Sequence, residues 1–140
     1  MIHIQNAKFV GVLPPISVAG GASATTTELD TVGFDYVALV IQSGLVGANG
    51  VPTVKLQESD TSGSGQADIS GAALTALVDA DDNEVFCIYV DMRKRKRYLT
   101  LVITNGATNA SVMSALAILT RGVQTPATAA ARGLTQQLFP

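Results

Sequence analysis

Hydrophobic and polar residues alternate with a period of two through the middle of the chain. The segment VKLQE (54–58) alternates cleanly, and YLTLVIT (98–104) repeats the alternation with Leu99, Leu101 and Ile103 on one face. A period of two places successive side chains on opposite sides of an extended backbone. Both segments are therefore predicted to be β-strands with one buried face.

Two further runs are apolar almost throughout. FDYVALVIQ (34–42) and EVFCIYVDM (84–92) are rich in β-branched and aromatic residues and are shorter than a typical helix. They are predicted to be strands that are buried on both faces. Cys87, the single cysteine, lies in the second run, where we expect a small buried hydrophobic side chain.

The connecting segments carry the chemistry of turns. GLVGANG (44–50) and DTSGSGQ (60–66) are glycine-rich, and NGATNA (105–110) begins with Asn-Gly, a hairpin signal between two apolar runs. Short strands at close intervals indicate an all-β fold. We expect a single-domain antiparallel β-sandwich, jelly-roll-like, with extended N- and C-terminal arms.

Two segments are ambiguous by pattern. Residues 70–82 are compatible with a short helix capped by Ser70, with Leu74, Leu77 and Val78 on one face. Residues 110–120 fit a helix or a strand by composition. A strand is favoured, because the preceding Asn-Gly would pair it with residues 97–104.

The two ends of the chain differ from its middle. Residues 13–27 and 122–140 are rich in Pro, Ala and Gly and have little periodicity. The expected organisation is an N-terminal strand and extended arm (1–27), a β-sandwich core (28–121) and a C-terminal arm (122–140). Leu138 and Phe139 follow a polar spacer, which fits either an arm that docks on a neighbouring subunit or plain terminal disorder.

Charge is scarce along the chain. Charged residues make up 14% of the 140 residues, and the formal net charge is −2. A typical soluble domain has about 25% charged residues, so a large part of this surface is expected to meet other protein. The acidic balance is no general footprint for nucleic acid. We see no secretory signal and no apolar run long enough for a membrane helix, and we expect a soluble protein made in a cytoplasm.

The sequence shows no pattern typical of a catalytic or ligand-binding site. His3 is the only histidine, so neither a catalytic triad nor a histidine-rich metal site is expected. GLVGANG lacks the glycine spacing and the following helix of a phosphate-binding loop. The acidic segment DADDNE (79–84) has the oxygen ligands for calcium but not the EF-hand spacing, and a solvated loop is the preferred interpretation. We predict no enzyme activity, no cofactor and no metal.

Five consecutive basic residues carry more than half of the positive charge: Arg93, Lys94, Arg95, Lys96 and Arg97. If the flanking strands pair, this run is the tip of a charged hairpin. Three interpretations remain open. The run is a solvated turn, it docks on an acidic protein partner such as segment 79–84 of another copy, or it contacts phosphates with Tyr98 stacked on a base.

Four stretches follow one another along the chain: KLQESD, DISGA, VDMRKRKRYLTLVIT and AILTRG. Over residues 30–125 this order resembles a family of small tailed-phage virion proteins that decorate or cement the capsid shell. The resemblance implies a non-enzymatic structural protein of the virion, made in the host cytoplasm. Its implied partners are the major capsid protein and other copies of itself, with a trimer as one arrangement, and neither a membrane nor nucleic acid. The resemblance does not extend to the arms. The candidate partner-binding residues come from the chain's own pattern: Arg93 to Arg97 of the basic run, and Leu138 and Phe139 of the C-terminal arm. The alternatives are a head–tail connector or tail component, and a carbohydrate-binding module for a host surface.

Overall fold

The computed structural model describes residues 3–138, in which the regular structure is almost entirely β. The strands are β1 (Lys8–Val18), β2 (Ser23–Thr25), β3 (Leu29–Asp30), β4 (Phe34–Val46), β5 (Thr53–Ser59), β6 (Ala67–Ala73), β7 (Val85–Asp91), β8 (Tyr98–Thr104) and β9 (Ser111–Gly122). Three short 3-10 helices complete the set: η1 (His3–Asn6), η2 (Asp79–Asp81) and η3 (Met92–Lys94).

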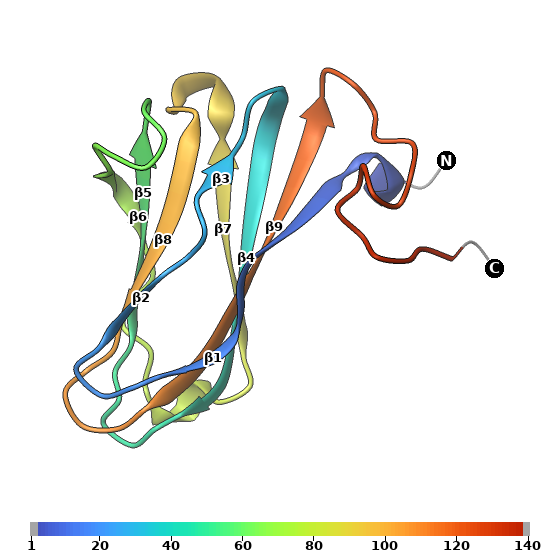
Figure 1. Ribbon diagram of the computed structural model, residues 1–140. Helices are drawn as coiled ribbons and strands as arrows, with labels where there is room; N and C mark the ends of the chain where they lie inside the picture. Colours follow the sequence, from blue (N-terminus) through green and yellow to red (C-terminus); the bar gives the residue numbers. More distant parts are fainter. Residues whose placement is uncertain (1–2, 139–140) are drawn as a thin grey trace.

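The strands form two antiparallel sheets that pack face to face (Figure 1). Sheet A has the order β1-β9-β4-β7, and sheet B has the order β2-β8-β5-β6 with β3 also paired to β8. The predicted all-β sandwich is confirmed.

The pairing is nested along the chain. β1 pairs with β9, β2 and β3 pair with β8, β4 pairs with β7, and β5 pairs with β6. The chain therefore runs as one long antiparallel hairpin, with its tip between β5 and β6, rolled so that alternate pairs fall into different sheets. This connectivity is that of a jelly roll.

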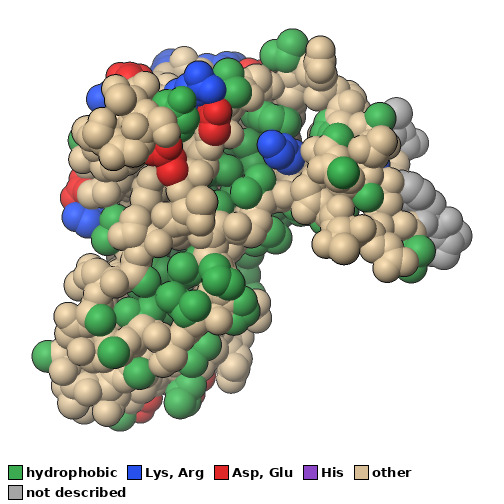
Figure 2. Space-filling view, viewed as in Figure 1, with side chains coloured by type: hydrophobic (Ala, Val, Ile, Leu, Met, Phe, Trp, Pro, Cys, Tyr) green, Lys and Arg blue, Asp and Glu red, His purple; other side chains and the backbone are tan. Residues whose placement is uncertain are grey.

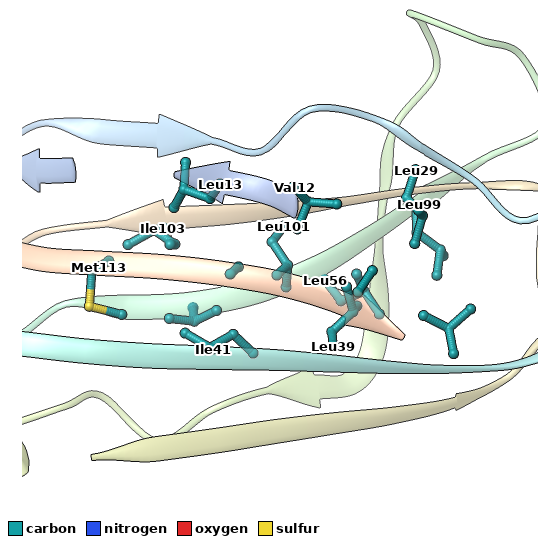
Figure 3. Close-up of a cluster of buried hydrophobic side chains, with 14 of the residues drawn as sticks. Val12, Leu13, Leu29, Leu39, Ile41, Leu56, Leu99, Leu101, Ile103 and Met113 are labelled. Carbon is teal, nitrogen blue, oxygen red and sulfur yellow. The ribbon is translucent and has the colours of Figure 1, made fainter. Parts of the chain in front are cut away.

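Between the sheets lies one hydrophobic core (Figure 3). Leu99, Leu101 and Ile103 of β8 point into it as the alternation predicts, and Val54 and Leu56 of β5 do the same. Sheet A contributes alternate residues of its central strands: Val37, Leu39, Ile41, Met113, Ala115, Ala117 and Leu119.

The predicted Asn-Gly hairpin is wrong, and the condition for a hairpin at residues 93–97 is not met. Strands β8 and β9 lie in different sheets, so the Asn-Gly segment is a crossover between sheets. An Asn-Gly hairpin turn needs positive φ at both residues, and neither Asn105 nor Gly106 has it. Strands β7 and β8 also lie in different sheets. Met92 at the start of η3 is buried in the core, and it carries the chain across from sheet A to sheet B.

The two ambiguous segments are both extended or irregular. Residues 111–122 form β9, so the preferred strand is confirmed, although its partners are β1 and β4. The helix predicted over 70–82 is wrong. The segment continues β6 to Ala73 and then passes irregularly to η2, with Leu77 buried and Val78 exposed. Leu74 and Leu77 instead donate backbone hydrogen bonds to Val54 and Pro52, which hold the segment against sheet B.

Much of the expected N-terminal arm belongs to the sandwich. Residues 8–18 form β1 and residues 23–25 form β2, and both pair with strands near the C-terminal end of the chain. β1 lies at a sheet edge and contains two prolines, Pro14 and Pro15, where its register with β9 is irregular. Its sequence therefore lacks a clear period of two and resembles that of an extended arm.

Candidate functional site

Sheet A has an outer face that is apolar and open. The residues that point away from the core are Tyr36, Ala38 and Val40 of β4, Cys87 and Tyr89 of β7, and Leu116 and Ile118 of β9. A shallow groove of about 620 Å³ runs over this face, and Ile4 of η1 borders it. We call these side chains the outer face.

The prediction that strands 34–42 and 84–92 are buried on both sides is therefore wrong for the outer face. Tyr89 is 82% exposed, and Cys87 is half-buried rather than buried. A strand that is covered on both sides within the protein has apolar residues on both sides. A strand whose second side binds another molecule has them too, so the pattern of apolar residues does not distinguish the two.

The rim of the groove is charged, whereas its floor is apolar. Arg93 and Arg121 both lie over the ring of Tyr36, with guanidinium carbons 5.2 and 5.5 Å from its centroid. Asp91, beside the groove, accepts two hydrogen bonds from the Arg93 guanidinium, which lower the pKa of the Asp91 carboxyl to about 2. An apolar floor inside a charged rim is the composition of a protein-binding surface.

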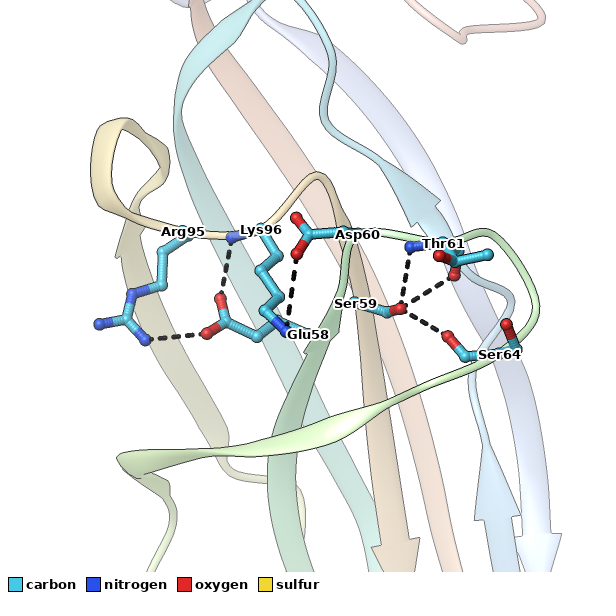
Figure 4. Close-up of polar contacts among 7 residues, drawn as sticks. All are labelled: Glu58, Ser59, Asp60, Thr61, Ser64, Arg95 and Lys96. Atoms are coloured by element: carbon cyan, nitrogen blue, oxygen red, sulfur yellow. Dashed lines mark hydrogen bonds and ion pairs between the residues drawn. The ribbon is translucent and has the colours of Figure 1, made fainter.

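Four of the five basic residues form ion pairs within the chain, and Figure 4 shows those of Arg95 and Lys96. We call residues 93–97 the basic crossover, since they lead from η3 to β8. Arg95 lies 3.3 Å from Glu58, and Lys96 lies 3.6 Å from Asp60. Arg97 binds Asp30 through two hydrogen bonds of 2.7 Å, which lower the pKa of the Asp30 carboxyl. Lys94 is the one member with no ion pair among residues 3–138.

This pairing changes the interpretation of the run. Asp30 and Glu58 lie at the ends of β3 and β5, so these pairs hold the crossover against one end of sheet B, while Arg93 pairs locally with Asp91 at the end of β7. Arg97 also covers the ring of Tyr98, with 4.9 Å between the guanidinium carbon and the ring centroid. Phosphate contact would have to compete with these ion pairs, and base stacking would compete with Arg97. Partner binding by residues 93–97 stays a prediction.

The acidic segment 79–84 is partly structural. Asp82 accepts a hydrogen bond of 2.6 Å from the backbone of Val46, and Asp81 accepts one from the backbone of Val78. Asp79 and Glu84 extend into solvent with no side-chain partner among the described residues. In residues 3–138 no group of three or more His, Cys, Asp or Glu side chains is placed to hold a metal ion.

The two ends of the described chain pack on each other in a terminal lobe, residues 3–7 with 123–138. Figures 1 and 2 show this lobe beside the sandwich. Arg132, 8% exposed, donates to the carbonyls of Gln5 and Ala127 and to the side chain of Gln137. Leu138 is 78% exposed at the end of the lobe, and Phe139 lies outside the described residues. Their docking on a neighbour remains a prediction.

Comparison with solved structures supports the fold. The enzymatically active domain of tailspike protein 4 from bacteriophage CBA120 superposes with a TM-score of 0.53 at 8% identity, over 84% of this chain and 20% of the tailspike chain. A structure of infectious bursal disease virus gives 0.48 at 15% identity, over 86% of this chain and 33% of that chain. The chain thus spans a fifth to a third of the length of these two proteins. At 8% identity, the likeness to the tailspike domain shows a fold alone.

No protein-family profile matches the chain, and no curated protein matches it. Among residues 3–138, every helix is too short or too polar to cross a membrane.

Proposed function

We propose that the chain is a non-enzymatic virion protein that binds a phage capsid shell and stabilises it as a decoration or cement protein. The observation that carries the proposal is the open outer face of sheet A, with its apolar floor and charged rim. The resemblance of residues 30–125 to small phage virion proteins agrees with it. The partners are the major capsid protein and further copies of this chain.

The outer face suits this task because it is broad and shallow. Apolar side chains on a regular sheet offer a rigid surface whose ordering costs little entropy on binding. A single copy would bind weakly through such a surface. Many copies that each touch several capsid subunits, or touch one another, would hold the shell through avidity.

Co-sedimentation tests the proposal directly. Purified protein is mixed with empty shells assembled from the major capsid protein of the same phage, and the shells are pelleted. We expect the wild-type protein in the pellet, and we expect Leu116→Arg, on the outer face, to stay in the supernatant. Val123→Arg is the matched control, because Val123 is 88% exposed in the terminal lobe and is not one of the outer-face side chains. Wild-type protein that stays wholly in the supernatant contradicts the proposal.

A second candidate is binding of a host-surface carbohydrate. Tyr89 favours it, since an exposed aromatic ring beside a groove is a typical platform for a sugar. The groove has few polar side chains to bond sugar hydroxyls, Asp91 and Thr120 among them, so this candidate ranks second. Retention on a glycan array that is lost in Tyr89→Ala would support it.

A further inference from the structure

The two sheets end in four edges, and three of these are blunted against pairing with another strand. Edge β1 contains Pro14 and Pro15 and two register shifts. Edge β2 with β3 consists of two very short strands. Edge β6 has a register shift against β5 and a glycine, Gly71, at a φ of 78°. Prolines, short strands and bulges are the usual devices that keep an edge from joining other strands.

Edge β7 has none of these devices. It pairs with β4 in seven consecutive register positions, from Tyr36 opposite Asp91 to Gln42 opposite Val85. Residues 85–90 contain no proline, glycine or charge. Val85 and Tyr89 are exposed. A regular, apolar and uncovered edge is a template for another strand.

The direction of the free backbone groups follows from the pairing with β4. The Ser43 amide donates to the carbonyl of Glu84, so alternate residues from Glu84 onward direct their backbone groups toward β4. The residues between them, Val85, Cys87, Tyr89 and Asp91, direct their amides and carbonyls toward the open edge.

The charges at the two ends of β7 indicate which strand pairs with this edge. The acidic segment 79–84 precedes the strand, and Arg93, Lys94 and Arg95 follow it. If two copies of β7 lie antiparallel, the acidic end of each meets the basic end of the other. Parallel pairing would bring like charges together at both ends. Glu84 and Lys94 are both exposed, and neither side chain forms an ion pair among residues 3–138, so both are available to a second copy.

We infer that β7 pairs antiparallel with β7 of a second copy about a two-fold axis, which joins two four-stranded sheets into one of eight strands. The register that overlaps the whole strand is centred on Ile88 and places Cys87 opposite Tyr89 of the second copy. It supplies about eight backbone hydrogen bonds, because four residues of each strand face the shared edge. The two outer faces become one continuous apolar surface. The inference stands apart from the proposed function, since self-association can be measured without a capsid.

Reciprocal charge reversal tests the pairing. Analytical ultracentrifugation over a concentration series should show a dimer for the wild type and weaker association for Glu84→Lys and for Lys94→Glu alone. An equimolar mixture of the two single variants should associate as the wild type does, because both contacts of the mixed dimer then join opposite charges. The double variant should also be restored. Circular dichroism checks that each variant is folded.

Cys87 reports the register, because it is the only cysteine of the chain. In the inferred register the two Cys87 residues are diagonal neighbours, roughly 7–8 Å apart. A short bis-maleimide should therefore link two copies of the wild type and none of Cys87→Ser. A wild type that stays monomeric at every concentration, a mixture that shows no rescue, or a dimer in which Cys87 cannot be linked would each overturn the inference.

Discussion

Asn105 organises the crossover from β8 to β9 by itself. Its side chain is 3% exposed, and its amide donates to the carbonyls of Val18 (2.9 Å) and Asn109 (2.8 Å) while its oxygen accepts from Ser111. One side chain thus bonds two backbone carbonyls and a hydroxyl, and it links the end of β1 to the start of β9. A buried group that loses its partner costs more than an exposed hydrogen bond contributes.

Replacing this amide should therefore destabilise the fold. We expect Asn105→Ala to lower the free energy of unfolding by about 2–3 kcal/mol, because the carbonyls that it serves lose their donor in the interior. Urea denaturation measures the change. Asn109→Ala is the control, since the Asn109 side chain bonds Ala48 at the surface, and its cost should stay below about 1 kcal/mol. Equal losses for the two variants would contradict the role of Asn105.

The Asp91–Arg93 pair makes a prediction about pH. Hydrogen bonds from Arg93 hold the pKa of the Asp91 carboxyl at about 2, below its ordinary value of 3.8. A lowered carboxyl pKa means that the pair contributes stability above about pH 4 and that this contribution is lost as the pH falls toward 2. Carboxyl NMR should show Asp91 titrating near 2 in the wild type and closer to 3.8 in Arg93→Gln. An unchanged midpoint in the variant would show that Arg93 is not the cause.

At the scale of the element, the crossovers between the sheets restrict the choice of amino acid more tightly than the strands do. Gly106 lies where the β8–β9 crossover passes over residues 47–50, and its amide donates to the carbonyl of Gly50. A Cβ at position 106 would collide with that carbonyl. The glycine of the Asn-Gly pair is thus needed for close approach of two backbones rather than for a hairpin turn.

This gives a substitution with a matched control. Gly106→Ala should lower the free energy of unfolding by about 1–3 kcal/mol, as expected when an added methyl forces backbone apart. Gly11→Ala adds the same methyl on β1, where no atom lies within 4 Å, and should change stability little. Thermal unfolding of the two variants under identical conditions separates them. A Gly11 variant as damaged as the Gly106 variant would refute the steric explanation.

The elements differ in how far their sequences predict them. Strands β5 and β8 could be predicted because apolar core residues alternate with more polar or less buried ones, and a period of two reports this directly. The sheet in which a strand lies could not, because Met92 and Asn105 direct the chain across the sandwich through tertiary contacts. For the same reason, the sequence did not predict that the outer face is open. Tyr36 and Val40 have the composition of a buried side, and only the arrangement of all nine described strands leaves that side uncovered.

The whole molecule is a closed roll with an appended lobe. Nested pairing ties the first strand to the last, so most of the sandwich forms only when distant parts of the chain meet. Such long-range topologies fold slowly. The terminal lobe adds no strand to either sheet, and it depends on a few polar contacts and on the close fit of Gly133 against Phe9.

Arg132 is the centre of that lobe, and its replacement should destabilise the lobe without destabilising the sandwich. Its guanidinium is buried with neutral acceptors from Gln5, Ala127 and Gln137, so it joins both ends of the chain without an acidic partner. In Arg132→Ala these acceptors lose a buried cation and its several donors. We expect hydrogen exchange to accelerate in residues 4–9 and 127–138 while β4 and β8 keep their protection, because the core between the sheets is untouched. Arg132→Lys keeps the charge but loses the forked geometry, so exchange in its lobe should be faster than in the wild type and slower than in Arg132→Ala. Acceleration in β4 as large as in the lobe would mean that the lobe and the sandwich unfold as one unit, and that the chain ends belong to the same cooperative structure as the core.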